Sequence, residues 1–201
     1  MVRYRNEHKQ ATRQRIIETA GRRFKRDGID ASGISTLMKD AGLTNGAFYT
    51  HFASKDDLVA TTVADQLQAQ NANIVAHAAP GLAGLEQIVR WYLSAQHRDS
   101  PGDGCPSAAL LDEIGRCTDS TRQAYTDGVL IVADGIAARL APDDPHSVRT
   151  KTLGAYALMA GTLQLSRALA DQQLADELLT QGIHNALAVL GVEHENVRTA
   201  N

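Results

Sequence analysis

The sequence predicts an all-α protein of about nine helices, and three observations lead to this prediction. Apolar residues recur at spacings of three and four along most of the chain, which is the spacing of helices with one buried face. No segment shows the apolar/polar alternation that is typical of a half-buried strand. Short stretches rich in glycine, proline and aspartate separate the periodic runs, for example SPGDG at 100–104 and APDDP at 141–145.

Three of these helices are expected near the N-terminus, and two glycines limit them. Gly28 ends the first and Gly42 ends the second, because glycine adopts the left-handed conformation that closes a helix without strain. Ser54 is the expected N-cap of the fourth helix. The predicted ranges are 9–27, 34–41 and 45–52, followed by 54–78, 82–98, 106–116, 120–140, 146–170 and 172–191, with a frayed tail after Gly191.

Composition limits the class of protein. The chain has 201 residues, of which 43% are hydrophobic and 21% charged, as is usual for a soluble globular protein. It contains no apolar run long enough for a transmembrane helix, and its charged N-terminus does not resemble a secretory signal. Two cysteines, Cys105 and Cys117, form no disulfide framework. We therefore expect a cytoplasmic protein with no membrane partner.

Charge is distributed unevenly along the chain. Residues 1–60 hold eleven Lys and Arg against seven Asp and Glu, although the net charge of the whole chain is −3. A basic end on an acidic body favours contact with a polyanion at that end. A solvated helix face with a charged tail is the alternative explanation.

The segment AGLTNGAFYTHF, residues 41–52, has the pattern of a helix–turn–helix. Phe48 and Phe52 are four residues apart, so they share one face of a helix and are expected to pack inward. Asn45 and Tyr49 share a neighbouring face and are expected to point outward. Small residues and a polar first turn are what a recognition helix needs to approach the major groove.

The run from Thr12 to Leu58 resembles the DNA-binding region of the tetracycline-repressor (TetR) family of transcriptional regulators. The matching residues are Ile16, Ile17, Ala20, Phe24, Gly28, Ala41, Gly42, Leu43, Gly46, Phe48, Tyr49, His51, Phe52, Ser54, Lys55 and Leu58. The resemblance implies an N-terminal helix-turn-helix DNA-binding domain over 1–56. It also implies a C-terminal helical domain for ligand binding and dimerisation over 57–201.

By this resemblance, the recognition helix covers about 44–52 and begins with Thr44, Asn45, Gly46 and Ala47. Tyr49, His51 and Lys55 are then expected to hold the phosphate backbone, with Thr50 near the groove, and the basic arm of Arg3, Arg5 and Lys9 to reach DNA. One departure is Gly33, where the family usually has a hydroxyl residue that can touch phosphate. Ser32 or Ser35 is the expected replacement.

The last two long predicted helices, 146–170 and 172–191, carry apolar residues on more than one stripe. An ordinary core would explain this pattern, but the resemblance favours a homodimer formed through these helices. An effector pocket is expected among the preceding helices, for an apolar or amphipathic small molecule. Its candidate lining residues are Trp91, Tyr92, Leu110, Ile114, Tyr125, Met159 and Leu163, each of which core packing would also explain.

The predicted function is that of a repressor that leaves a palindromic operator in double-stranded DNA when the effector binds. Cys105 precedes a helix start, where a thiol pKa falls, so a redox- or electrophile-sensing regulator of the same fold is the alternative. A bridge from Cys105 to Cys117 is excluded, because a helix separates them. An all-helical interaction protein without a DNA role is a further alternative. No catalytic or metal-ligand pattern is present, so neither an enzyme nor a cofactor is expected.

Overall fold

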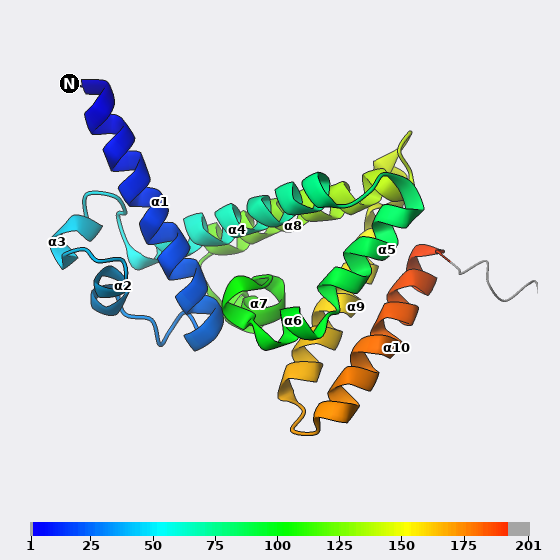
Figure 1. The fold of residues 1–201 in the computed structure, drawn as a ribbon. Helices are drawn as coiled ribbons and strands as arrows, with labels where there is room; N and C mark the ends of the chain where they lie inside the picture. Colours follow the sequence, from blue (N-terminus) through cyan, green and yellow to red (C-terminus); the bar gives the residue numbers. More distant parts are fainter. Residues whose placement is uncertain (1, 193–201) are drawn as a thin grey trace, which may run out of the picture. The chain divides into compact units, whose positions relative to one another are not determined.

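The computed structural model describes residues 2–192, with side chains from residue 6 onward, and it confirms the all-α prediction for that part of the chain (Figure 1). The α-helices there are α1 (Val2–Asp27), α2 (Ile34–Asp40), α3 (Asn45–Phe48), α4 (Lys55–His77), α5 (Gly81–Tyr92), α6 (Ala95–Asp99), α7 (Ser107–Arg116), α8 (Asp119–Leu140), α9 (Arg149–Ala168) and α10 (Gln172–Leu190). Two short 3-10 helices occupy Pro101–Asp103 and Pro145–Val148. The tail after residue 192, predicted to fray, lies outside the described residues, as do the side chains of Arg3 and Arg5.

The chain divides into two compact units. The first comprises Met1–Ala69 and Pro101–Val129, and the second comprises Gln70–Ser100 and Leu130–Asn201. Helices α4 and α8 therefore each contribute residues to both units. This division by compactness differs from the functional boundary predicted at residues 56 and 57, which stays a prediction.

The core of the first unit forms around α1. Ile16, Ile17, Ala20 and Phe24 are all buried, as their helical spacing predicts. Helix α1 begins at Val2 and not near residue 9, because no glycine or proline interrupts the residues between. Its inner face packs against α2 and against the segment 101–116, which lies far away in the sequence (Figure 1).

Two predicted helices are shorter or divided in the structure. The expected helix over 82–98 breaks at Ser94, whose Oγ accepts a hydrogen bond from the His97 amide at 3.2 Å and so starts α6 as a new helix. This break accounts for the tenth α-helix among the described residues. The expected helix over 45–52 is regular only to Phe48, because the His51 amide then bonds back three residues to the Phe48 carbonyl.

The second unit contains the antiparallel pair α9 and α10, which pack against each other along their length (Figure 1). Close contact requires a glycine: a Cβ on Gly182 of α10 would lie 2.6 Å from Cγ2 of Thr162. Asp171 caps the start of α10, and Gly191, with φ of 78°, caps its end. No helix within residues 2–192 is both long enough and apolar enough to cross a bilayer.

Candidate nucleic-acid interface

The turn between α2 and α3 has the geometry that its sequence predicts. Gly42 has φ of 66°, and its amide bonds to the Lys39 carbonyl at 3.0 Å. The next amide, that of Leu43, bonds to the Met38 carbonyl at 2.8 Å, which completes a glycine-terminated helix end. Only glycine takes this φ without strain, so Gly42 fixes the direction in which α3 leaves α2.

Helix α3 is anchored by its inner face. Phe48 and Phe52 are buried with ring centroids 5.7 Å apart, and the guanidinium of Arg13 lies 4.8 Å from the Phe52 ring centroid. The face that the sequence predicts to point outward does so: Asn45 and Tyr49 are exposed, Tyr49 by 69%. A tyrosine ring with that exposure is available to a partner, and it is held in place by an edge contact with Phe48.

Of the other residues expected at the start of the recognition helix, Thr44 and Gly46 are exposed. Thr44 is the N-cap residue of α3, but its side chain makes no cap hydrogen bond. Gly46 has no atom within 4 Å of a Cβ placed on it, and Ala47 is half-buried. Thr50 is exposed and donates its hydroxyl hydrogen to the Ala47 carbonyl at 2.7 Å, which leaves the oxygen able to accept a bond. A polar and unobstructed surface therefore surrounds the first turn of α3.

His51 is half-buried beside this surface. Its Nδ1 is buried and has no hydrogen-bond partner within the described structure. Burial lowers the pKa of His51, and the positive charges of Lys9 and Arg13 lower it further. The shift favours the neutral form of the imidazole, and Lys9 and Arg13 of α1 carry positive charge on this side.

Lys55, predicted to bind phosphate, has an internal partner in this structure. Its Nζ donates to the Ile29 carbonyl at 2.6 Å, in the loop between α1 and α2. An ammonium group has three donors, so this bond leaves capacity for a phosphate. At the start of α4, Ser54 is the capping residue: its Oγ accepts from the Asp57 amide, while the Asp57 carboxylate accepts from the Ala53 amide.

The structure corrects the expected role of Ser32. Its side chain is fully buried, and its hydroxyl donates to the Gly28 carbonyl at 2.7 Å, so it cannot take the place of the hydroxyl missing at Gly33. Spacing from Gly33 alone does not reveal this, because the local loop bond decides where the hydroxyl points. Ser35 and Thr36, in the first turn of α2, are exposed.

One residue near this interface was missed by the sequence reasoning. Glu113 of α7 accepts hydrogen bonds from the Ile29 amide at 2.7 Å and the Asp30 amide at 3.2 Å, both at Oε2. The loop before α2 is thus held by Glu113 at its amides and by Lys55 at a carbonyl. Gly28 permits this approach, because it has φ of 90° and a Cβ there would lie 2.9 Å from Glu113 Oε1. No sequence signal indicates a contact between residues 84 positions apart.

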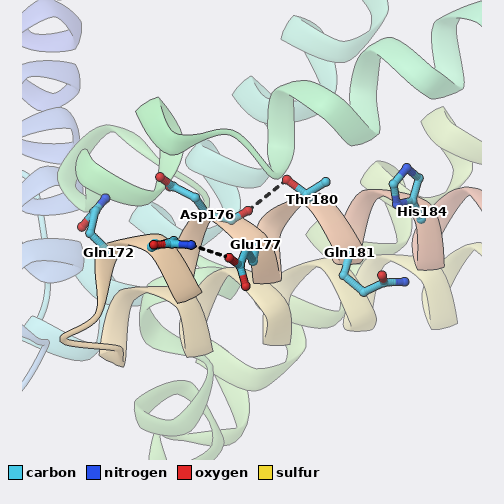
Figure 2. Close-up of a pocket in the computed structure, with 7 residues that line it drawn as sticks. Gln172, Asp176, Glu177, Thr180, Gln181 and His184 are labelled. Carbon is cyan, nitrogen blue, oxygen red and sulfur yellow. Dashed lines mark hydrogen bonds between the residues drawn. The ribbon is translucent and has the colours of Figure 1, made fainter.

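The residues expected to bind an effector fall into both units. Leu110, Ile114 and Tyr125 belong to the first, and Trp91, Tyr92, Met159 and Leu163 to the second. Of the two cavities described, a groove of about 600 Å³ runs along the polar face of α10, where Figure 2 shows Glu177, Gln181 and His184. The other, of about 510 Å³, is lined by Trp91 but by none of the remaining candidates.

Both cysteines are free thiols in the structure. Cys105 is only 3% exposed, and a sensor thiol needs access to its reagent. Burial raises the pKa of the Cys117 thiol, and the nearby carboxylates of Asp56, Asp30 and Glu113 raise it further. Within the described residues, no three His, Cys, Asp or Glu side chains gather as a metal site would require.

These features define a helix-turn-helix protein of the DNA-binding class. They are the glycine-closed turn, the short helix anchored by two phenylalanines and its exposed polar face. Residues 16–62 match the family described as "Bacterial regulatory proteins, tetR family". This match confirms the resemblance inferred from the sequence for the DNA-binding region.

Curated relatives match over a short stretch of the chain. The chain is 40% identical over 58 residues to the HTH-type transcriptional regulator AcrR of Shigella flexneri, covering 29% of this chain and 27% of AcrR. It is 42% identical over 59 residues to the regulator TtgR of Pseudomonas putida, covering 29% of this chain and 28% of TtgR. The chain thus spans little more than a quarter of the length of each of these relatives.

Solved structures match over nearly the whole chain. The reduced form of NemR from E. coli superposes with a TM-score of 0.71 at 18% identity, over 88% of this chain and 95% of NemR. A TetR-family regulator from Agrobacterium tumefaciens gives a TM-score of 0.70 at 19% identity, over 88% and 98%. At such low identities the likeness shows the fold and nothing about the ligand.

Proposed function

We propose that this protein is a ligand-responsive transcriptional repressor that binds a palindromic operator as a homodimer. The observation that carries the DNA-binding part is the exposed polar face of α3, with Tyr49 outward over buried Phe48 and Phe52. An isolated four-residue helix would not hold one orientation in water, so its anchoring is what makes it a reading element. A cytoplasmic location is part of this proposal, since the operator lies there.

The proposed contacts divide into two kinds. Asn45 and Ala47 lie at the start of α3, where an amide can pair with adenine and a methyl can meet a thymine methyl. Thr44 and Gly46 allow the helix end to approach closely. Tyr49, His51 and Lys55 are assigned to the phosphate backbone, with Thr50 near the groove, and exposed Ser35 takes the contact that Ser32 cannot make.

Lys55→Ala is expected to weaken DNA binding about equally on all sequences and to lower the salt dependence by about one released counterion. Tyr49→Phe removes only a hydroxyl and is expected to weaken binding by several-fold, about the value of one hydrogen bond to a charged group. The measurement is fluorescence anisotropy with DNA from upstream of the gene, at two salt concentrations, with unrelated DNA as competitor.

The matched control is Arg122→Ala, which removes an exposed cation from α8 that pairs with Asp119. If Arg122→Ala weakened binding as much as Lys55→Ala, the affinity would come from net charge and not from the α3 surface. If no sequence in a random-oligonucleotide selection bound, the interaction-protein alternative would replace the regulator proposal.

The proposed dimer forms through α9 and α10. On α9, Gly154, Leu158, Gly161 and Leu165 follow one another at helical spacing, and all lie outside the core. On α10 the corresponding outward stripe comprises Leu174, Leu178, Gln181, Asn185 and Val189. Small residues that face leucines let the helix pairs of two subunits approach closely. The resulting two-fold dimer presents two recognition helices, one to each half of a palindrome.

Leu165→Glu is expected to convert the dimer to a monomer, because it places a charge in the proposed contact. Sedimentation velocity measures the change in mass. Leu82→Glu on α5 is the control, since Leu82 is 52% exposed and Leu165 53%, while Leu82 lies outside the stripe. A monomeric wild-type protein, or equal dissociation by both variants, would refute this interface.

We assign the effector role to an apolar or amphipathic small molecule that binds the C-terminal part of the chain. Its binding is coupled to DNA binding, so that it lowers the affinity for the operator. The thiol-sensing alternative loses support because Cys105 is buried. The seven candidate lining residues stay a proposal, and Trp91 is the one that a described cavity supports.

A further inference from the structure

A groove of about 510 Å³ lies between the last turns of α4 and the helix α5, wholly within the second unit. It lies far along the chain from α3, the proposed DNA-reading element. The residues that line it are Asn73, Ile74, His77, Ala78, Gln87, Ile88 and Trp91. A volume of this size is typical of a small-molecule site, which usually measures about 300–1,000 Å³.

Trp91, the single tryptophan of the chain, forms one side of the groove. His97 stacks on the indole, with ring centroids 5.4 Å apart and planes 19° apart, and Tyr92 contacts it edge-on at 6.5 Å. These two contacts fix the ring, yet Trp91 remains 51% exposed. Trp91 lines the groove while His97 covers part of its ring, so a partly exposed indole with a set orientation is available to a ligand.

The polar groups around the groove carry no formal charge of their own, apart from what His77 can gain by protonation. Asn73 and Gln87 supply amides, and among the described residues no carboxylate, lysine or arginine lines the groove. The cation that reaches this end of α4, Arg139, is engaged with the carbonyls of Ile74, Ala78 and Ala79. A charged ligand would lose water here without gaining an opposite charge, so the lining favours a neutral one.

We propose that this groove binds a neutral, planar aromatic molecule that stacks on the exposed part of the Trp91 indole. Its ring edge takes hydrogen bonds from the amides of Asn73 or Gln87, and its apolar face covers Ile74, Ala78 and Ile88. That this molecule is also the effector of DNA binding rests on the proposed function. The binding itself does not.

Binding can be measured on the full protein without DNA. Excitation at the red edge of tryptophan absorption selects Trp91, since it is the single tryptophan of the chain. A ring that stacks on the indole perturbs this fluorescence. The probes are flavone (neutral and planar), 2-naphthoate (planar anion), proflavine (planar cation) and 1-decanol (apolar and not planar). Saturable quenching by flavone is expected, confirmed by calorimetry, with a dissociation constant about tenfold or more below that of 2-naphthoate and 1-decanol.

Two variants locate the site. Asn73→Phe fills the groove and keeps the reporter, so we expect flavone binding to weaken at least about tenfold. Val75→Phe adds the same side chain two residues along α4, at an exposed position outside the lining, and is expected to leave binding unchanged. Trp91→Leu, measured by calorimetry, should weaken flavone binding to a similar extent as Asn73→Phe.

The proposal is overturned if flavone gives no saturable signal, if 1-decanol or proflavine binds as tightly, or if Asn73→Phe behaves like Val75→Phe. The DNA-anisotropy assay without any probe tests the proposed function separately. Flavone binding with no DNA binding would leave the groove established and remove the regulator. DNA binding with no flavone binding would support the regulator and refute the proposed groove ligand.

Discussion

Glu113→Ala is expected to destabilise the protein by about 2–4 kcal/mol, because it removes a carboxylate that accepts two backbone hydrogen bonds. The amides of Ile29 and Asp30 would lose their shared partner in a loop that precedes α2. Glu113→Gln keeps an acceptor of the same shape and is expected to cost about half as much. Urea unfolding followed by circular dichroism measures these changes.

The same substitution is expected to weaken DNA binding by about tenfold, which corresponds to about 1.4 kcal/mol. The loop held by Glu113 also supplies the Ile29 carbonyl that Lys55 contacts, and it leads directly into α2. Loosening the loop therefore disturbs both the helix-turn-helix and one proposed phosphate contact.

Asp112→Ala is the matched control for Glu113. Asp112 is the preceding residue on α7, but its exposed carboxylate pairs with Arg116 four residues along the same helix. Exposed pairs of this kind contribute about 0–1 kcal/mol. Equal losses from Asp112→Ala and Glu113→Ala, in stability and in DNA affinity, would show that the contact to the loop has no special role.

Gly84→Ala is expected to destabilise the second unit by about 2–3 kcal/mol, despite the higher helix propensity of alanine. A Cβ at Gly84 of α5 would lie 1.7 Å from the Ala79 carbonyl oxygen, and a backbone atom cannot move aside as a side chain can. That carbonyl also accepts a hydrogen bond from Arg139 Nε at 3.2 Å. Displacing it would disturb the guanidinium that holds the end of α4.

Gly115→Ala should have the opposite sign. Gly115 lies in α7 with no atom within 4 Å of the added methyl group, so only helix propensity changes. A gain of up to about 1 kcal/mol is expected. Thermal unfolding of both variants tests the pair, and a Gly84→Ala protein as stable as wild type would mean that the α4–α5 turn can open by more than an ångström without loss.

Sequence patterns predicted the structure correctly where contacts between residues three or four positions apart control it. The four-residue spacing of Phe48 and Phe52 predicted their burial, and that of Asn45 and Tyr49 predicted their exposure. The left-handed conformation of Gly42 followed from its place after a helical run. The end of α3 was misplaced, because a three-residue hydrogen bond at His51 competes with helix continuation on nearly equal terms.

Other errors have a different origin. Helical sequence lies on both sides of Ser94, so the sequence does not show whether Ser94 continues one helix or caps a second one. The packing of Tyr92 against His97 favours the cap. Ser32 was assigned outward by proximity to Gly33, whereas its hydroxyl is bound within the loop. The candidate pocket residues could not be sorted, because buried apolar side chains look the same in sequence whether they fill a core or line a cavity.

The sequence by itself determined the all-α class, the helix-turn-helix and its outward face, because all of these depend on contacts within one or two helical turns. Only the tertiary structure decided which long-range partners complete the site. Glu113 reaches Ile29 across 84 positions, and α4 and α5 bring Asn73 and Trp91 to one groove. Contacts of this kind leave no periodic trace in the chain, since they depend on how separate helices pack and not on the spacing within any one of them.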